Sequence, residues 1–248
     1  MLKEKRMRMI MEILQKKEFV KVKELHNTLD VTEMTIWRDL KELEDKGAIR
    51  RMRGGAKWIA PINDGNLLHT KRMSLNLDKK KIIAKKAAAL IEDKDVIFIS
   101  SSSTNELIKE YIQAKDVCIV TNSLVIFRQY YMDLNFEVLL IGGKFHHAES
   151  SFLGSISNDF IGGMRFKKAF MGTNGIRDNS CFASNDEEGV FYRMVLNNTD
   201  ERYVLCDTTK FNKDAFYRYY SCDDLSAIIT DNGSIEHREL YEGYTKLL

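Results

Sequence analysis

Apolar residues in the first 60 positions of the chain recur at the spacing that places them on one face of an α-helix. The pattern predicts a first helix around Met9, Ile10, Ile13 and Leu14, and a shorter second helix around Val22, Leu25, His26 and Leu29. A third predicted helix buries Ile36, Leu40 and Leu43. Thr32 can cap its N-terminus, and Gly47 stands where a left-handed residue often ends a helix.

The segment Ala48–Ala56 predicts a strand, a Gly-Gly turn that carries arginines, and a returning strand. Such a hairpin after three helices forms a winged helix-turn-helix, whose third helix fits the major groove of DNA. A charged three-helix module can also dock on protein, but arginines beside a glycine turn favour phosphate contact. The residues predicted to contact DNA are Thr32, Glu33, Met34, Thr35, Trp37, Arg38, Lys41, Arg50, Arg51, Arg53 and Gly54. Trp37 has two open interpretations, a DNA contact or packing under the hairpin.

Beyond about residue 78, short apolar runs rich in β-branched residues alternate with helical patterns. Helices are predicted over residues 78–91, Asn105–Ile112 and Glu187–Leu196. The predicted strands are Val96–Ile99, Val117–Val120, Phe136–Ile141, Lys168–Met171, Tyr203–Cys206 and Ala227–Ile229. This alternation predicts a Rossmann-like α/β domain with a mostly parallel sheet covered on both faces.

Small, hydroxyl-bearing and glycine residues follow the first five predicted strands. In chain order they are Ser100–Thr104, Thr121–Ser123, Gly142–Gly143, Gly172–Gly175 and Asp207–Lys210. Each alone is typical of a turn. The carboxyl ends of parallel strands meet at one edge of the sheet, where ligands bind, and a helix beginning near Ser103 would offer amides to an anion. The five together predict a ligand pocket in which the serine run forms one wall.

The only proline, Pro61, lies in a polar stretch that interrupts every helical period, and it marks the predicted seam. We expect a winged helix-turn-helix domain at 1–57, a linker at 58–77 and an effector-sensing α/β domain at 78–248. Residues 1–60 hold 15 basic and 10 acidic side chains, whereas residues 61–248 hold 23 and 26. The basic excess therefore accompanies the predicted DNA-binding helices.

No apolar run approaches the roughly 20 residues that span a bilayer, and the charged N-terminus is unlike a signal peptide. We expect a cytoplasmic protein without membrane contact. The cysteines Cys118, Cys181, Cys206 and Cys222 form no CxxC pair, so neither a metal site nor a disulfide framework is indicated. We expect no cofactor.

Residues 8–56 resemble the helix-turn-helix of the DeoR family of bacterial transcriptional regulators. The matching positions are Thr35, Ile36, Arg38, Asp39, Leu40, Gly54, Gly55 and Ala56. Trp37 stands where the family has the first of two arginines, so one guanidinium that can grip a phosphate or a guanine is absent. The resemblance implies operator binding with a changed sequence preference or affinity.

The resemblance extends through the C-terminal part, which in the family is similar to sugar-phosphate isomerases and senses phosphorylated sugars or related metabolites. The expected effector-binding residues are Ser100, Ser101, Ser102, Ser103, Thr104, Thr121, Asn122, Gly142, Gly143, Gly172, Asn174, Glu188, Asp207 and Lys210. Ser100 replaces an acid of the family pattern, Ser102 replaces a glycine, and Phe191-Tyr192 stand where Val-Lys is expected. Serine resists the positive φ that glycine permits, and loss of the lysine removes a positive charge. We expect these departures to change the ligand preference or abolish it.

These inferences predict a homo-oligomeric repressor of genes for carbohydrate uptake or catabolism, released from operator DNA by a sugar-phosphate effector. One alternative is an isomerase-like enzyme with an appended DNA-binding module and Glu188, Asp207 and Lys210 as acid/base groups. The loop Gly172–Gly175 lacks a carboxylate, which argues against catalysis, and we expect no enzyme. A second alternative is a constitutive DNA binder with a degenerate pocket.

Overall fold

The computed structural model describes residues 3–17, 19–45, 49–58 and 72–248. The chain divides into two compact units, Met1–Asp64 and Gly65–Leu248. Gly47, Ala48 and Pro61 lie outside the described residues, as does most of the linker expected at 58–77. Residues 72–77, the last part of that expected linker, are described and contact the C-terminal unit through Arg72 and Asn76.

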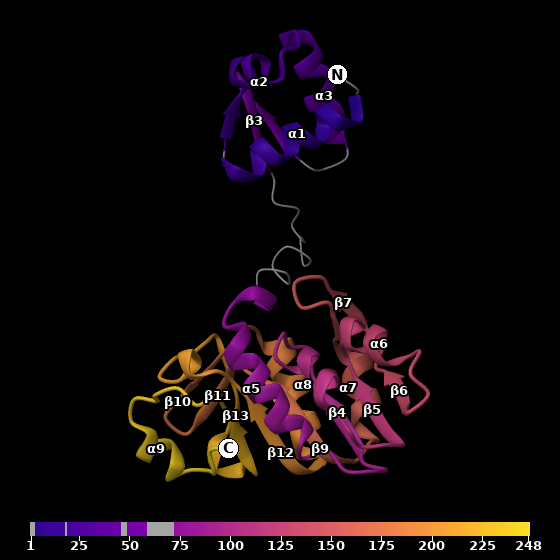
Figure 1. Cartoon of the computed structure of the whole chain (residues 1–248), viewed down its shortest axis with the longest axis vertical. Coiled ribbons are helices and arrows are strands. Elements are labelled where there is room, and N and C mark those ends of the chain that lie inside the picture. Colours follow the sequence, from indigo (N-terminus) through magenta and orange to yellow (C-terminus); the bar gives the residue numbers. More distant parts are fainter. Residues whose placement is uncertain (1–2, 18, 46–48, 59–71) are drawn as a thin grey trace. The chain divides into compact units, whose positions relative to one another are not determined.

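The N-terminal unit has three helices and a three-stranded antiparallel sheet (Figure 1). Its elements are α1 (Lys3–Lys16), β1 (Phe19–Lys21), α2 (Val22–Leu29), α3 (Glu33–Asp45), β2 (Ile49–Met52) and β3 (Gly55–Trp58). The sheet order is β1-β3-β2. The apolar positions at helical spacing, including Ile10, Leu25 and Ile36, form one buried cluster. The predicted winged helix-turn-helix is thereby observed in the described residues.

The strand β1 was not predicted. It is three residues long and runs directly into α2, so its sequence carries no alternation long enough to separate it from the helix. Its pairing depends on Gly55, because a Cβ at that position would lie 2.2 Å from the carbonyl oxygen of Val20. Only glycine therefore allows β3 to approach β1 this closely.

The C-terminal unit is built on a six-stranded sheet whose order is β14-β12-β9-β4-β5-β6. Its strands are β4 (Val96–Ile99), β5 (Val117–Thr121), β6 (Phe136–Leu140), β9 (Phe166–Gly172), β12 (Thr199–Leu205) and β14 (Ala227–Ile229). Every neighbouring pair is parallel. All six predicted strands are present, with ends that differ by at most a few residues, and the predicted parallel sheet is confirmed.

Helical segments cover both faces of this sheet (Figure 1). They are α5 (Leu77–Ala88), η1 (Asn105–Tyr111), α6 (Leu124–Tyr130), α7 (Ser155–Gly162), α8 (Asp186–Asn197), η2 (Thr208–Lys210), η3 (Cys222–Asp224) and α9 (Arg238–Glu242). Side chains alternate along β4, so Ile97 and Ile99 share a core with α5, η1 and α6, whereas Phe98 shares a core with α7 and α8. The sheet thus has two cores, as its uninterrupted apolar strands predict.

Two smaller sheets complete the unit. Strands β10 (Gly175–Arg177), β11 (Ser180–Ala183) and β13 (Tyr217–Ser221) form an antiparallel sheet, and β7 (Lys144–His146) pairs with β8 (Ser151–Leu153). None of these strands was predicted, because each has only three to five residues and lacks a run of apolar residues. All four cysteines are free.

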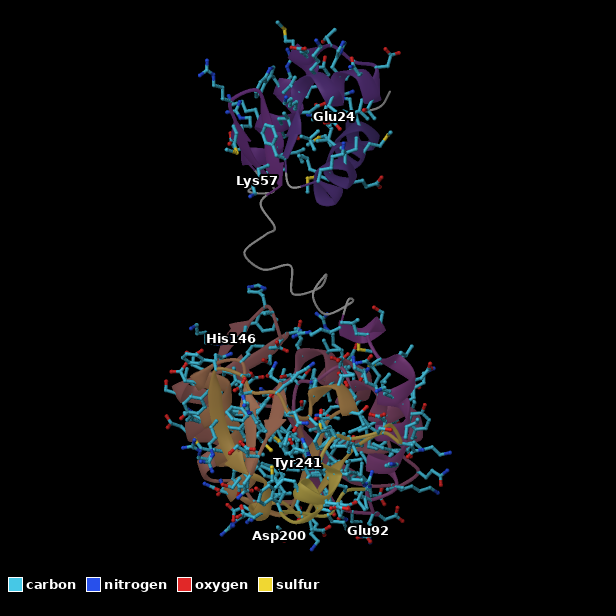
Figure 2. The ribbon with its side chains drawn as sticks, turned by 90° about the vertical axis from the view of Figure 1, so that its left-hand side faces the viewer. Glu24, Lys57, Glu92, His146, Asp200 and Tyr241 are labelled. Carbon is cyan, nitrogen blue, oxygen red and sulfur yellow. The ribbon has the colours of Figure 1, made fainter. Side chains whose placement is uncertain are left out.

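The two ends of the large sheet carry different kinds of residue. Glu92 precedes β4, Asp200 is the second residue of β12, and both lie at the opposite end of the unit from His146 of β7 (Figure 2). The carboxyl ends of the strands therefore face the His146 end. The small polar residues that follow the predicted strands meet at this edge.

Candidate DNA-binding surface and polar cavity

Helix α3 begins as its sequence predicts. Thr32 precedes the helix, and its hydroxyl accepts a hydrogen bond from the backbone N–H of Thr35 at 3.3 Å. Glu33, Met34 and Lys41 are exposed, and Met34 exposes 73% of its surface. Arg38 is exposed as well. Ionic and apolar side chains are thus available along one helix that can enter a major groove.

Asp39 has a structural partner within the same unit. Its carboxylate accepts hydrogen bonds from Arg6 of α1, with Nε at 2.5 Å and Nη2 at 3.1 Å. The two side chains expose 2% and 11% of their surfaces. The hydrogen bond to the Asp39 carboxylate raises the pKa of Arg6, and this effect outweighs the opposing effect of burial. Asp39 therefore fixes α3 against α1.

Trp37 is half-buried and packs against the apolar cluster of the N-terminal unit. This contact accounts for a large aromatic residue where the family pattern has an arginine. Much of the indole anchors α3, and its half-exposed part remains beside the helix surface.

The hairpin β2–β3 turns at Gly54, where φ is +82°. Glycine adopts this left-handed conformation without the steric cost of a side chain. Arg51 and Arg53 are exposed beside the turn, and the Arg51 guanidinium lies 2.5 Å from the carboxylate of Glu44. The side chain of Arg50 lies outside the described part. Arg53 is thus better placed than Arg51 for a phosphate, because Arg51 already has an anionic partner.

The C-terminal unit has a polar cavity of about 60 Å³ at the carboxyl ends of β4 and β9. Its walls combine hydroxyl groups, carboxylates and cations. The lining residues are Arg72, Ser101, Ser102, Ser103, Glu149, Gly172, Thr173, Asn174, Glu188, Tyr192 and Lys210. Seven of these were predicted from the sequence: Ser101, Ser102, Ser103, Gly172, Asn174, Glu188 and Lys210.

The four serines Ser100–Ser103 do not all lie in the same place. Ser101, Ser102 and Ser103 line the cavity, whereas Ser100 is buried beneath it and accepts a hydrogen bond from the backbone N–H of Gly172 at 2.9 Å. Ser102 has no positive φ, so the glycine of the family pattern is not needed for backbone conformation. Gly172 instead leaves room for the side chain of Ser102, because a Cβ at position 172 would lie 2.8 Å from the Cβ of Ser102.

The helix after the serine run differs from the prediction. It is a 3₁₀-helix that begins at Asn105. The amide of Thr104 donates to the hydroxyl of Ser102, and the amide of Glu106 donates to the carbonyl of Ser102. Within the described part of the chain, the amides of Ser102 and Ser103 have no acceptor. Two amides of the loop, instead of a helix terminus, are therefore available to an anion.

Two cations line the cavity and a third, Lys80, contacts one of its lining residues, and the sequence pattern revealed only Lys210. Arg72 reaches it from the segment before α5, and Lys80 of α5 donates to the hydroxyl of Ser103 at 2.9 Å. Burial lowers the pKa of Lys80, and the positive charge of Lys210 acts in the same direction. The cavity is therefore a place where a bound anion would relieve repulsion between cations.

Two carboxylates face these cations. Glu149 forms an ion pair with Arg72, and Glu188 accepts a hydrogen bond from the hydroxyl of Tyr192 at 2.8 Å. Burial raises the pKa of Glu149, against the attraction of Arg72. Tyr192 occupies the region of the lysine in the family pattern, and Arg72 and Lys80 supply positive charge from elsewhere.

The other expected effector residues lie outside the cavity lining because their polar groups serve the fold. Thr121 donates to the carbonyl of Ile99 at 2.7 Å, and Asn122 accepts from the amide of Ser101 at 3.4 Å. The carboxylate of Asp207 accepts from the amide of Thr209. Four more, Ser100, Thr104, Gly142 and Gly143, also lie outside the lining.

The winged helix-turn-helix with exposed basic side chains, joined to an α/β unit with a polar cavity, defines a two-domain transcriptional regulator. Residues 6–61 match the family model of the DeoR-like helix-turn-helix domain, and residues 75–232 match that of the DeoR C terminal sensor domain. The chain belongs to the DeoR family. The predicted resemblance and the predicted class of DNA-binding regulator are confirmed.

Several relatives match almost the whole chain. A lactose phosphotransferase system repressor of Lactococcus lactis subsp. lactis is 35% identical over 252 residues, which cover 99% of this chain and 98% of the relative. A repressor of the same name from Staphylococcus epidermidis is 32% identical over 241 residues, or 96% of each chain. Among solved structures, a D-ribose-5-phosphate isomerase in complex with phospho-erythronic acid is similar with a TM-score of 0.39, 17% identity and coverage of 54% of each chain.

Within the described residues, no helix is long and apolar enough to cross a membrane. The same residues hold no group of three or more His, Cys, Asp or Glu side chains arranged to bind a metal ion.

Proposed function

We propose that this protein is a cytoplasmic, homo-oligomeric repressor of genes for carbohydrate uptake or catabolism. Its N-terminal unit binds operator DNA through α3 and the hairpin β2–β3, and a phosphorylated sugar in the polar cavity releases it. The names of the two relatives support repression over activation. They also make genes of a sugar phosphotransferase system the first candidates for regulated genes.

The composition of the polar cavity is the observation that carries the effector class. Arg72, Lys80 and Lys210 offer positive charge to a phosphate, and the amides of Ser102 and Ser103 can donate to its oxygens. Glu149, Glu188 and Asn174 can accept or donate hydrogen bonds to sugar hydroxyls. One small cavity thus contains groups for both halves of a sugar phosphate.

We further propose that the cavity binds without catalysis. The three acid/base candidates of the isomerase alternative do not share the cavity, because Asp207 lies outside its lining and bonds to Thr209 and Asn76. Glu188 is held by Ser184 and Tyr192. A mobile proton-transfer pair needs a base within hydrogen-bond reach of the substrate proton, and these contacts leave Glu188 fixed in a network. No interconversion of pentose or hexose phosphates is expected from the purified protein.

A thermal-shift screen tests the effector class. Hexose 6-phosphates and pentose 5-phosphates are each compared with the corresponding unphosphorylated sugar and with inorganic phosphate. At least one sugar phosphate should raise the melting temperature in proportion to the logarithm of its concentration, and beyond the shift given by its sugar. Equal shifts from the sugar and its phosphate would remove the basis for a phosphorylated effector, and no shift from any compound would favour the degenerate pocket.

A further inference from the structure

Strand β6 is an exposed edge of the large sheet. It stands at one end of the strand order, at the margin of the C-terminal unit in Figure 1, and among the described residues it pairs only with β5. Its sequence, FEVLL, is apolar at four of five positions, but none of the five residues is buried. Each of the other five strands of the sheet has at least three buried residues. The fold therefore leaves the apolar side chains of β6 uncovered.

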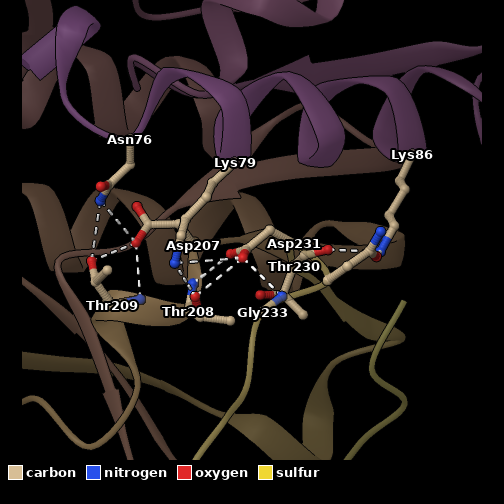
Figure 3. A network of polar contacts seen from close by, with 10 residues as sticks. Asn76, Lys79, Lys86, Asp207, Thr208, Thr209, Thr230, Asp231 and Gly233 are labelled. Atoms are coloured by element: carbon tan, nitrogen blue, oxygen red, sulfur yellow. Dashed lines mark hydrogen bonds and ion pairs between the residues drawn. The ribbon is translucent and has the colours of Figure 1, made fainter.

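The opposite edge of the sheet, at β14, is closed by the chain itself. The N–H of Ile228 donates to the carbonyl of Lys246 at 2.9 Å, and the N–H of Thr230 donates to the carbonyl of Leu248 at 2.9 Å. Figure 3 shows that the loop after β14 is also bonded to α5, where Lys86 donates to the carbonyl of Thr230 at 2.8 Å. The two edges of the sheet thus differ, because the C-terminal residues cover only the edge at β14.

The outer backbone groups of β6 are available to another strand. The N–H of Ile141 donates to the carbonyl of Thr121 in β5 at 2.8 Å, and successive residues of a strand direct their backbone groups to opposite sides. The N–H and C=O groups of Val138 and Leu140 therefore point away from β5, and within the described residues they have no partner. Edge strands are usually protected from pairing by a lysine, a proline or a bulge, and β6 has none of these.

The outer edge of β6 is complementary to a second copy of itself. In an antiparallel pair centred on Val138, the two Val138 residues would exchange both backbone hydrogen bonds. The N–H of Leu140 in each copy would donate to the C=O of Phe136 in the other, and Glu137 would lie opposite Leu139. A register centred on Glu137 would instead place two carboxylates opposite each other, which is destabilising. Charge therefore favours the register centred on Val138.

Exposed apolar side chains lie beside this edge. Tyr131, Met132 and Leu134, in the segment before β6, expose 56%, 76% and 101% of their surfaces. In the register centred on Val138, Leu134 of one copy approaches Gly142 of the other, where a Cβ would meet no atom within 4 Å. These side chains can add to the backbone pairing the apolar contact that the core of a stable interface contains.

We propose that two copies of this chain associate through β6, with the two strands pairing antiparallel about a two-fold axis so that their sheets become continuous. A two-fold contact uses the same surface on both copies, which is what a self-complementary strand provides. The inference rests on the proposed function, which it deepens by naming the interface of the homo-oligomer. Two helix-turn-helix units joined in this way can bind the two halves of a pseudo-palindromic operator.

Charges placed at position 139 test both the pairing and its register. The mass of the full-length protein is measured by analytical ultracentrifugation over a range of micromolar concentrations. L139E places a carboxylate opposite Glu137 of the second copy, so it should weaken association about tenfold or more. L139K places an ammonium group there and should keep most of the association. The double variant E137K/L139E again has opposite charges across the pair and should recover the association that L139E loses.

L240E is the matched control for L139E. Leu240 of α9 exposes 42% of its surface and Leu139 exposes 39%, so the two substitutions add the same charge at similar exposure. Helix α9 and β6 lie on opposite sides of the C-terminal unit in Figure 1. L240E should therefore leave association unchanged. Melting temperatures of all variants establish that each is folded.

The outcomes distinguish this inference from the proposed function. A wild type that stays monomeric would overturn the inference and leave β6 open to a strand of another protein. Equal effects of L139E and L139K, or no effect of L139E, would overturn the self-pairing. Operator binding is measured separately. If L139E stays associated and binds operator, only this inference fails, whereas a wild type that associates through β6 and binds no operator defeats the proposed function alone.

Discussion

The buried pair Arg6–Asp39 gives the sharpest prediction for the N-terminal unit. D39A removes a carboxylate that accepts two hydrogen bonds from Arg6, at 2.5 and 3.1 Å, and takes this acceptor away from a guanidinium that is largely out of solvent. Breaking a buried pair costs about 3–5 kcal/mol, and we expect about 3 kcal/mol here because Arg6 keeps some exposure. A unit of this size has a stability on the order of 3–8 kcal/mol, so the variant should be partly or fully unfolded in that unit.

Tryptophan fluorescence isolates this unit, since both tryptophans of the chain, Trp37 and Trp58, belong to it. Urea unfolding followed by fluorescence should show the loss in D39A. Far-ultraviolet dichroism should lose only the signal of the N-terminal helices, and the unfolding transition of the C-terminal unit should keep its midpoint. A double-mutant cycle with R6M should give a coupling free energy of at least about 1 kcal/mol. Additive effects of the two substitutions, within about 0.5 kcal/mol, would refute the assignment of Asp39 as the residue that fixes α3 to α1.

Three further predictions concern the two functional surfaces. R38Q and K41Q should each weaken DNA binding without changing stability. Each should also reduce the slope of log affinity against log salt by about 0.9 if its cation contacts a phosphate. An unchanged slope and affinity in both variants would show that α3 is not part of the DNA interface. G172A should destabilise the chain by about 1–3 kcal/mol, because its Cβ would lie 2.8 Å from that of Ser102, and S102G should restore much of the loss in calorimetric melting. Because burial raises the pKa of Glu149 above 4.5, the folded chain binds a proton that the unfolded chain releases, so its contribution to stability falls as pH rises from 4.5 through the raised pKa. The difference in melting temperature between wild type and E149Q should follow that decline, and a difference independent of pH would contradict it.

The sequence predicted those elements that repeat a period long enough to detect. Six apolar runs became the six strands of the parallel sheet, and Ile36, Leu40 and Leu43 became the buried face of α3. The short strands β10, β11 and β13 carry no such period. They are stabilised by pairing with one another. Their positions depend on tertiary contact and are absent from the local pattern.

Of the residues that line the polar cavity, the sequence predicted those that follow strands of the large sheet. Ser101, Gly172 and Lys210 follow strands of one parallel sheet. Residues at the carboxyl ends of such strands meet at the same edge of the sheet. Arg72 lies in a short helical segment before α5 and Glu149 lies in a hairpin loop, and the ion pair between them joins residues 77 positions apart. No spacing rule connects two such segments, so the cation that replaces the family's lysine could not be found from the sequence.

Positive charge reaches the cavity from a part of the chain other than the position of that lysine. The sequence suggested a weakened phosphate site, because Tyr192 stands near the position of the lysine in the family pattern. In the structure Tyr192 holds Glu188, while Arg72 and Lys80 bring positive charge from the segment that precedes and begins α5. Ligand preference is accordingly expected to depend on this segment more than on Ser100, whose hydroxyl supports the backbone of Gly172.

The central claim is that a phosphorylated sugar in the polar cavity controls DNA binding, and one titration tests it most directly. Operator DNA is selected from a random pool with the purified protein, labelled, and bound at fixed salt, and fluorescence anisotropy is followed as each sugar and its phosphate are added. One sugar phosphate should lower operator affinity by about five-fold or more while its unphosphorylated sugar does not, and R72Q should require a higher concentration for the same release. Operator affinity that stays constant through the whole series of sugar phosphates would contradict the claim.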